Sequence, residues 1–182
     1  MVAENHLNRE FSINTPNQRW VTDITYIRTY EGWLFLCTIQ DLFSRKIVGW
    51  SMDSQMKNNL IMKALMMAIW NRKPKNEIII HSDQGLQYTS YEWRDFLKVN
   101  NFKMSNSRRG NCHDNATAES FFSLLKGEQI RNQTYKTREA AKTEIFEFIE
   151  MFYNPVRRYG TLGMISLNQF ELNYIRDKKK VV

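Results

Sequence analysis

Apolar and polar positions alternate along the early part of the chain in a way that is typical of β-strands. WVTDITYI (20–27) alternates and is rich in β-branched and aromatic residues, and WLFLCTIQDLFS (33–44) and KIVGWSMD (46–53) are two further strand-like stretches. A turn at 30–32 separates the first two stretches, and a short polar link at 43–46 joins the last two. Links this short suit antiparallel neighbours, so we predict three antiparallel strands in a row.

The apolar residues recur with the period of a helix from Asn58 onward, and Pro74 ends this stretch. Further along, the pattern predicts strands at 77–83 and 102–107, and helices at 90–101, 116–130 and 137–154. Ser90 is expected to cap the first of these helices, and Pro155 to stop the last. The order βββαβαβαα predicts an α/β fold with a mixed five-stranded sheet, three antiparallel strands first and parallel additions after them, with helices on both faces.

The composition fits one packed domain, because the 182 residues are 42% hydrophobic and include only three prolines. We expect residues 1–19 to form an arm or the remnant of a linker, 20–165 the folded core, and 166–182 a basic carboxyl-terminal tail. Two cysteines are too few for a disulfide framework or a four-cysteine zinc site. No apolar run approaches the ~18 residues that would span a bilayer, so we expect a cytoplasmic protein with no membrane partner.

The net charge of +7 and the pI near 9.4 are compatible with a polyanionic partner, although basicity alone is weak support for nucleic-acid binding. Basic residues cluster at Arg108-Arg109, Arg157-Arg158 and 178–180. The last cluster is expected to be a solvated tail.

Three carboxylates are candidate site residues, and the position of Asp23 is unusual for an ordinary surface residue. Asp23 lies in the middle of the first predicted strand, where a bare charge is costly unless it is paired or bound to a metal. Asp83 follows the buried run 78–80 and precedes Gly85, so it is either a turn former or a ligand at a strand end. Glu119 lies near the start of a predicted helix.

The helix that carries Glu119 has a polar stripe on one face, formed with Asn115, Ser123 and Lys126. This stripe is either part of a site or merely the solvated face of the helix. Two strand ends and a helix can meet at one edge of such a sheet, because neighbouring strands lie about 4.8 Å apart. Three carboxylates are ligands that Mg²⁺ prefers, and a pair of such ions can drive an in-line phosphoryl displacement without a side-chain base.

Four stretches resemble the catalytic core of bacterial insertion-sequence transposases that are similar to retroviral integrases, the OrfB type of the insertion-sequence three family. They are WVTDITYI, LFLCTIQDLFSRKIVGWSM, HSDQGLQYTS and SRRGNCHDNATAESFFSLLKGE. The resemblance runs from about Phe11 to Glu171. Asp83 and Glu119 are separated by 35 residues, as in the D,D(35)E pattern of those enzymes, and Lys126 matches their basic residue seven positions after the glutamate.

The resemblance implies a ribonuclease-H-like fold, with 20–165 as an integrase catalytic core. It makes Asp23, Asp83 and Glu119 both the catalytic residues and the ligands of Mg²⁺ or Mn²⁺, with two ions when DNA is bound. It also implies DNA, both element ends and target, as the partner, a homo-oligomer in the active complex, and a location on the bacterial nucleoid. The residues expected to contact DNA are Lys126, Arg108, Arg109 and Asn115.

Other residues have competing interpretations. His81, Cys112 and His113 match no common zinc spacing and are expected to pack in the core or in loops. Asp41 is expected to order the turn that contains Ser44 and Arg45. Asp114 and Asn115 are good helix caps, and for Asn115 a place near the scissile phosphate is the alternative. The core is expected to include Cys37 and the tryptophans at 20, 33, 50, 70 and 93.

The carboxyl-terminal segment departs from the family pattern at three positions, with Tyr159, Met164 and Leu167 where His, Tyr and Pro are usual. Residues 1–19 do not match the family's end-recognising helix-turn-helix, which predicts DNA binding with little sequence preference. The segment 108–116 is expected to be mobile without DNA. We predict a transposase or integrase catalytic domain; the alternatives are a ribonuclease-H-like nuclease that cuts without joining, and an inactive basic module for DNA binding or oligomerisation.

Overall fold

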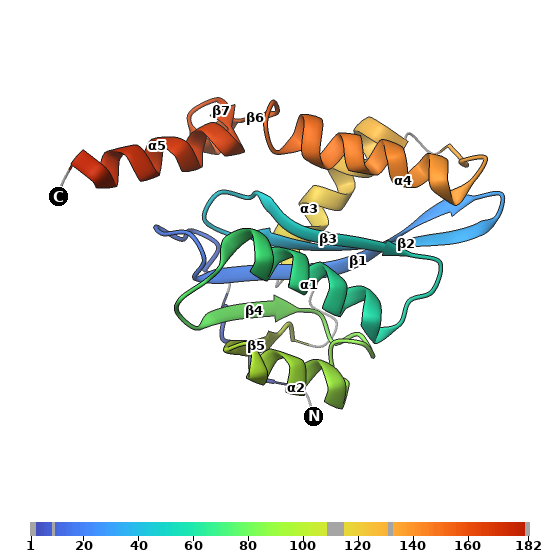
Figure 1. Cartoon of the computed structure of the whole chain (residues 1–182), viewed down its shortest axis with the longest axis horizontal. Helices are drawn as coiled ribbons and strands as arrows, with labels where there is room; N and C mark the ends of the chain where they lie inside the picture. The colour runs from blue at the N-terminus through green and yellow to red at the C-terminus, as the bar shows by residue number, and fades with distance from the viewer. Residues whose placement is uncertain (1–2, 9, 109–114, 131–132, 181–182) are drawn as a thin grey trace.

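The fold is built on a five-stranded mixed sheet. A computed structural model describes residues 3–8, 10–108, 115–130 and 133–180 (Figure 1). The strands are β1 (Arg19–Thr29), β2 (Gly32–Asp41), β3 (Ile47–Asp53), β4 (Ile78–Ser82) and β5 (Phe102–Asn106), in the spatial order β3-β2-β1-β4-β5. The pairs β1·β2 and β2·β3 are antiparallel, and β1·β4 and β4·β5 are parallel. The predicted mixed sheet is therefore confirmed, including the three antiparallel strands at its start.

The register of β1 against β4 sets the height of two of the candidate carboxylates. Val21 is aligned with His81 in this parallel pair. Continuing the two strands by two residues brings Asp23 level with Asp83, and adjacent strands lie about 4.8 Å apart. The register therefore places these two residues at the same end of neighbouring strands, just beyond their paired part.

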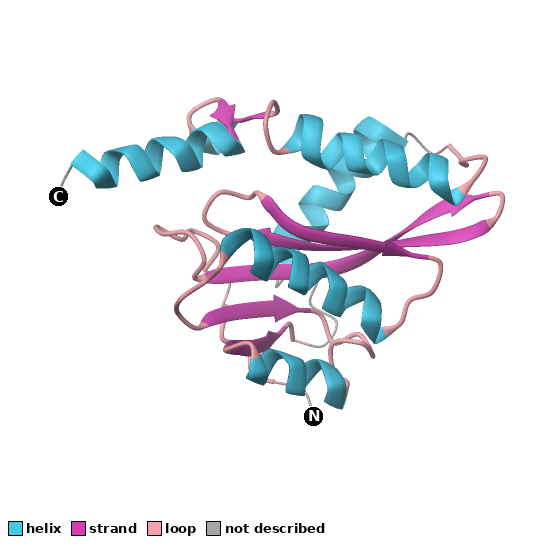
Figure 2. Ribbon diagram, in the orientation of Figure 1, coloured by secondary structure: helices cyan, strands magenta, loops and turns pink. Residues whose placement is uncertain are grey.

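Helices cover both faces of the sheet, as predicted (Figure 2). On one face α1 (Asn58–Arg72) and α2 (Tyr91–Val99) pack over β1 to β5. Gly49 lets α1 approach β3 closely, because a Cβ atom at this position would lie 2.3 Å from the Ala64 carbonyl oxygen. Any larger residue there would push the helix away from the sheet.

The opposite face is covered by α3 (Ala116–Leu124), the π-helical turn η2 (Leu125–Ile130), α4 (Arg138–Phe146) and its π-helical continuation η3 (Glu147–Tyr153). These elements correspond to the two long helices predicted at 116–130 and 137–154. The second ends just before Pro155, as expected from the missing amide hydrogen of proline. Phe121 of α3 packs edge-on against Tyr153, with ring centroids 4.8 Å apart, so α3 and η3 share one core.

The segment expected to be a basic tail contains a helix, α5 (Leu167–Lys180). It follows a small hairpin of β6 (Arg158–Tyr159) and β7 (Ile165–Ser166), with the short helical turn η4 (Gly160–Leu162) between them. The first turns of α5 lie against the core, where Leu167 is fully buried. Its last turn carries the three lysines of 178–180 and is exposed.

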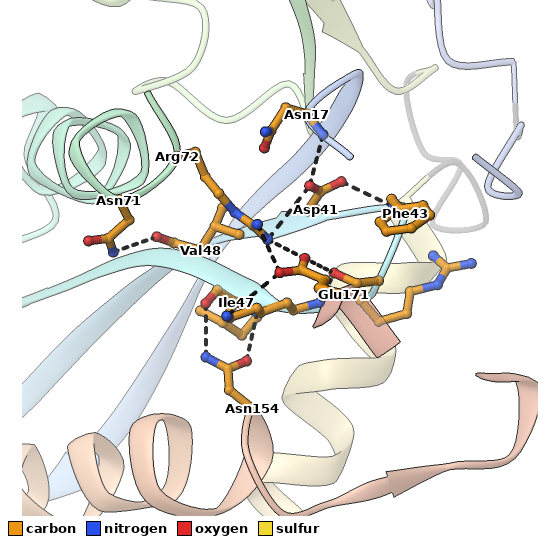
Figure 3. Close-up of polar contacts among 12 residues, drawn as sticks. Asn17, Asp41, Phe43, Ile47, Val48, Asn71, Arg72, Asn154 and Glu171 are labelled. Atoms are coloured by element: carbon orange, nitrogen blue, oxygen red, sulfur yellow. Dashed lines mark hydrogen bonds and ion pairs between the residues drawn. The ribbon is translucent and has the colours of Figure 1, made fainter. Parts of the chain in front are cut away.

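A buried ionic cluster connects α5 to the sheet and to the end of α1 (Figure 3). Glu171 is only 8% exposed and accepts hydrogen bonds from both guanidinium nitrogens of Arg72 and, at 2.6 Å, from the hydroxyl of Ser44. The Nζ atom of Lys46 lies 3.7 Å from the same carboxylate, and Arg72 also faces Asp41 at 3.8 Å. We call this cluster the Glu171 latch.

The amino-terminal arm also lies on the core. The side chain of Leu7 is buried against Val21 and Ala118, and the backbone N–H of His6 donates to the hydroxyl of Ser105 on β5. This contact covers part of the outer edge of the sheet. None of the helices in the described part of the chain has the length and apolar character needed to cross a membrane.

The expectation that all five tryptophans are core residues is wrong for two of them. Trp20 and Trp93 are buried, and Trp50 is half-buried, with its indole N–H donating to Glu150 at 2.8 Å. Trp70 is 77% exposed on α1, and Trp33 is 47% exposed near the start of β2. Residue type alone does not reveal which tryptophans face the solvent. The predicted burial of Cys37 is confirmed.

Candidate active site

Asp23 lies in the middle of β1, on the face that α3 covers, and is partly buried. Its Oδ1 atom accepts a hydrogen bond from the backbone N–H of Ile24 at 2.8 Å. Its pKa is raised to about 7, mainly by burial; the Ile24 N–H opposes the rise, and the negative charges of Asp83 and Glu119 contribute to it. The charge of Lys126 lowers the same pKa. All three of these charged groups therefore act electrostatically on Asp23.

Asp83 follows the last residue of β4 and is exposed. Its backbone carbonyl accepts hydrogen bonds from the Ser82 hydroxyl at 3.0 Å and from the Asn106 amide at 2.9 Å. Its carboxylate accepts the N–H of Gly85 at 2.9 Å. A Cβ atom at Gly85 would lie 3.0 Å from that same carboxylate oxygen, so the glycine leaves room for the Asp83 side chain. The turn interpretation of Asp83 is thus correct and is compatible with a ligand role.

Glu119 lies in the first turn of α3 and is exposed. A carboxylate is favoured there by the helix dipole. The start of α3 is fixed by Arg45, whose guanidinium donates to the Thr117 hydroxyl at 2.9 Å and to the Phe11 carbonyl at 3.0 Å. The sequence predicts only a turn at Arg45. No pattern in the sequence predicts its hydrogen bond to Thr117 of α3.

The three carboxylates do not form a closed ligand cage in this structure. Within the ranges that the structure describes, no three His, Cys, Asp or Glu side chains lie close enough together to hold a metal ion. Their mutual effect is instead visible in the raised pKa of Asp23. The donor set consists entirely of hard oxygen atoms, which fits Mg²⁺ or Mn²⁺ and does not fit a thiolate-preferring metal.

A buried layer of hydroxyl groups supports Asp23 from the other face of β1. Thr22 contacts the hydroxyl of Tyr88 at 3.1 Å and the thiol of Cys37 at 3.6 Å. Burial raises the pKa of Cys37 to about 12, and it raises the pKa of Tyr88 well above its ordinary value. These groups therefore stay neutral and add no charge beside Asp23. Sequence reasoning did not identify them as part of the site.

The other predicted site residues have different environments. Lys126 is exposed on η2, with its Nζ atom 5.1 Å from the ring centre of Tyr26. Arg108 is exposed, and Arg109 lies outside the described residues. Most of the segment 108–116, which was expected to be mobile, also lies outside them.

Asn115 precedes α3, but its side chain does not cap the helix as expected. It is 3% exposed and donates to the Thr22 carbonyl at 3.5 Å, beside Asp23. Its Oδ1 atom is buried without a hydrogen-bond partner among the described residues. The strand competes with the helix end for this amide, which explains the incorrect cap prediction.

Two of the competing interpretations can also be judged. Asp41 orders the turn after β2, because it accepts the N–H groups of Asn17 and Phe43 at 3.0 and 3.1 Å. Both ring nitrogens of His81 contact serine hydroxyls, on Ser105 at 2.8 Å and Ser107 at 3.1 Å, which agrees with the expected packing role. Cys112, His113 and Asp114 lie outside the described residues.

The matches to known families agree with this arrangement. Two family models, both described as integrase core domain, match residues 13–112 and 119–174. The chain belongs to the integrase core domain family. The predicted resemblance to insertion-sequence transposases is confirmed by two relatives. The transposase InsF for insertion sequence IS3A of Escherichia coli (strain K12) is 45% identical over 170 residues, which cover 93% of this chain and 59% of InsF.

An uncharacterized 31 kDa protein of insertion element IS600 from Shigella sonnei is 43% identical over 173 residues, which cover 95% of this chain and 64% of that protein. The chain therefore spans about three fifths of the length of these curated relatives.

Solved integrase structures share the fold of this member of the family. A chain of the simian T-cell lymphotropic virus intasome, in complex with PP2A regulatory subunit B56 gamma, aligns with a TM-score of 0.72 at 16% identity, covering 93% of this chain and 58% of that one. The HTLV-2 integrase catalytic core domain in complex with magnesium, in its trimeric form, aligns with a TM-score of 0.60 at 17% identity, covering 85% of this chain and 96% of that one. The predicted ribonuclease-H-like fold is therefore confirmed.

Proposed function

We propose that this chain catalyses metal-dependent hydrolysis and strand transfer of DNA phosphodiester bonds in transposition. The observation that carries the proposal is Asp23, a strand residue whose pKa is raised to about 7 by burial and by the charges of Asp83 and Glu119. Such an arrangement costs folding free energy, and strongly shifted pKa values concentrate at functional sites. The membership of the integrase core domain family supports the same conclusion.

In this proposal Asp23, Asp83 and Glu119 hold Mg²⁺ or Mn²⁺, with two ions when DNA is bound. Bound ions would activate water, and then a DNA 3′-hydroxyl, and would neutralise charge at the phosphate. The fold positions the three proposed ligands. Asp23 lies on β1 and Glu119 on α3. The backbone carbonyl of Asp83 is held by hydrogen bonds from Ser82 and Asn106. The magnesium of the HTLV-2 integrase core is consistent with this choice of ion.

The proposed DNA contacts are electrostatic. Lys126 and Arg108 are exposed cations, and Arg109 adjoins Arg108 in sequence. Asn115, held beside β1, would lie near the scissile phosphate. Phosphate contacts carry no base information, so we expect weak sequence preference and a steep loss of affinity with salt, about −0.9 in log K per phosphate neutralised. Equal binding of an element-end duplex and a scrambled duplex across a salt series would support this part of the proposal.

The enzymatic proposal is tested with labelled duplex DNA in Mg²⁺ or Mn²⁺, by measuring nicked and joined products separately. Asp83→Asn and Glu119→Gln are expected to lower both products by about 1000-fold or more, or about 4 kcal/mol of transition-state stabilisation. Asp177→Asn is the matched control, since this carboxylate is exposed near the end of α5. Nicking without joining would point to a nuclease, and metal-independent binding with neither product to an inactive DNA-binding module.

The remaining parts of the proposal concern partners and place. We propose that the active complex with element ends and target DNA is a homo-oligomer; the HTLV-2 core domain has trimeric and dimeric forms. We also propose that the protein acts in the cytoplasm on nucleoid DNA, which agrees with the free, buried thiol of Cys37. Sedimentation with and without DNA would test the assembly.

A further inference from the structure

A pocket of about 330 Å³ lies between the β1–β2 hairpin and η2. Tyr26 and Trp33 form its aromatic wall, and Arg28 and Lys126 contribute its positive charge. These two aromatic and two basic side chains are not needed for the pairing of β1 with β2 or for the packing of α3. The catalytic residues proposed above do not line the pocket.

The aromatic wall is exposed although it is made of large side chains. Tyr26 is 57% and Trp33 47% exposed, and their rings meet edge to face with centroids 5.1 Å apart at 79°. This contact holds the two rings in a fixed relative orientation. Aromatic faces that remain in water and are held in place can stack against a planar ligand.

The charges around this wall are not neutralised by the protein. The Nζ atom of Lys126 lies 5.1 Å from the centre of the Tyr26 ring. Among the described residues, neither Lys126 nor Arg28 forms an ion pair, whereas Arg72 and Arg157 each have a carboxylate partner. Two uncompensated cations beside two aromatic rings are complementary to a nucleotide, which combines a planar base with an anionic phosphate.

The position of the pocket relates it to the reaction. Tyr26 lies three residues beyond Asp23 on β1, about 10 Å along the strand and with its side chain on the other face. Lys126 follows Glu119 by two helical turns, and its charge acts on Asp23. Beyond Val21 the edge of β1 is not paired with β4, so a nucleotide close to the phosphate at the carboxylates would pass this edge, beside Lys126, to reach the aromatic wall.

We propose that this pocket is a subsite for one unpaired base of the DNA end, stacked against Trp33 and Tyr26, with Lys126 and Arg28 at its flanking phosphates. The inference rests on the proposed function and defines its substrate more closely: a DNA end whose base pair next to the reacting phosphate is open. A base within an intact duplex is stacked on its neighbours and cannot use the aromatic wall.

The test uses the whole 182-residue chain without divalent metal, and two short DNA duplexes. One carries a single unpaired 2-aminopurine at its end, and the other an abasic residue at the same position. The protein is expected to bind the first about 10-fold more tightly and to quench its fluorescence, because stacking against aromatic side chains is lost with the base. Equal affinity for the two duplexes, without quenching, would overturn the proposal, and this comparison needs no variant.

Variants then locate the subsite. Trp33→Leu and Tyr26→Leu are expected to remove the 10-fold preference, whereas Trp33→Phe retains it. Trp70→Leu is the matched control, because Trp70 is also exposed beside a lysine, with Lys73 5.8 Å from its ring, but lies on α1 and does not line the pocket. Thermal melting checks that each variant folds. A preference that survives in both leucine variants at the hairpin would contradict the assignment of the pocket.

The result is separable from that of the proposed function. Base preference is a binding property measured without metal, whereas nicking and joining require Mg²⁺ or Mn²⁺. Preference without nicking would support the subsite and count against the enzymatic proposal. DNA nicking without a preference for the unpaired base would support the enzymatic proposal and count against the subsite.

Discussion

Asp23 on β1 and Glu171 on α5 are both carboxylates withdrawn from water, and their pKa values move in opposite directions. The pKa of Asp23 is raised to about 7, mainly by burial and in smaller part by the neighbouring carboxylates. Burial also acts to raise the pKa of Glu171, but the hydrogen bonds and charge of Arg72, the Ser44 hydroxyl and the charge of Lys46 hold it below its ordinary value. The first group lacks a close cationic partner among the described residues, and the second has two.

The difference separates a site from a structural contact. In the Glu171 latch the protein itself supplies the compensating charge, so the folded state is stabilised without any ligand. Around Asp23 the described residues supply no ion pair, and in the proposed function a bound metal ion provides the compensation. Asp41 is intermediate: burial raises its pKa to about 6, although two backbone N–H groups and Arg72 oppose the rise.

Removing each charge should therefore have opposite effects on activity and stability. Asp23→Asn is expected to lower DNA nicking and joining by about 1000-fold, because the amide cannot replace an ionised metal ligand. In the wild type, Mg²⁺ should raise the melting temperature, since it binds only the folded state. The variant should show neither activity nor this metal-dependent shift in calorimetry. If Mg²⁺ still raised the melting temperature of Asp23→Asn, Asp23 would not be a metal ligand, and its contrast with Glu171 would fail.

Glu171→Ala is expected to destabilise the fold by about 3 kcal/mol, because Arg72 then remains buried without its main partner. For a chain of this size the melting temperature should fall by about 9 °C. Asp177→Ala on the exposed part of the same helix is the control and should change little. Urea unfolding measures both variants. A loss as small as that of the control would mean that the Glu171 latch contributes nothing to stability.

Asp23→Asn should stabilise the metal-free protein at pH 8 by an amount on the order of 2 kcal/mol. The folded pKa of Asp23, about 7, exceeds its ordinary value of 3.8, so the folded state holds the proton more tightly. The contribution of this group to stability is then complete below pH 3.8 and is lost as the pH rises through 7. The advantage of the variant should accordingly vanish in acid, which denaturant titrations at pH 8 and pH 4 would measure.

The smallest effect concerns the pH dependence of the Glu171 latch. The folded pKa of Glu171 lies below its ordinary value of 4.5, so its stabilisation is complete above pH 4.5 and is lost as the pH falls through the folded pKa. The difference in unfolding free energy between wild type and Glu171→Ala should shrink by about 1 kcal/mol between pH 6 and pH 3.5. A difference that grew in acid would show that the carboxylate is not held ionised by Arg72.

Local patterns were sufficient to predict the sheet. The β-branched and aromatic stretches, the short links and the buried run at 78–80 correspond to the observed strands within a few residues. The ranking of Asp23, Asp83 and Glu119 as candidates came from strand and helix positions together with the family resemblance. The role of these three residues stays a prediction, because pattern and resemblance do not determine where side chains point.

Contacts between distant segments were not predictable in the same way. The hydrogen bond from Ser44 to Glu171 joins residues 127 positions apart, and no periodicity links them. Likewise, the reach of Arg45 to Thr117 depends on how α3 crosses the sheet. Asn115 was assigned to the helix cap because cap statistics are local, whereas its amide is bonded to a strand. Tertiary geometry outweighed local preference in each case.

The sequence separation between the residues of the Glu171 latch affects the order in which parts of the protein fold during synthesis. Arg72 and Glu171 are 99 positions apart, so during synthesis the arginine emerges from the ribosome long before its partner exists. At roughly 5–20 residues per second, the nascent chain spends about 5–20 seconds with Arg72 lacking Glu171 and having, among the described residues, only the more distant Asp41 as a partner. All five strands of the main sheet have been synthesised by then. We therefore expect the nascent protein to form its sheet first and to pack α5 against it only after α5 has been synthesised.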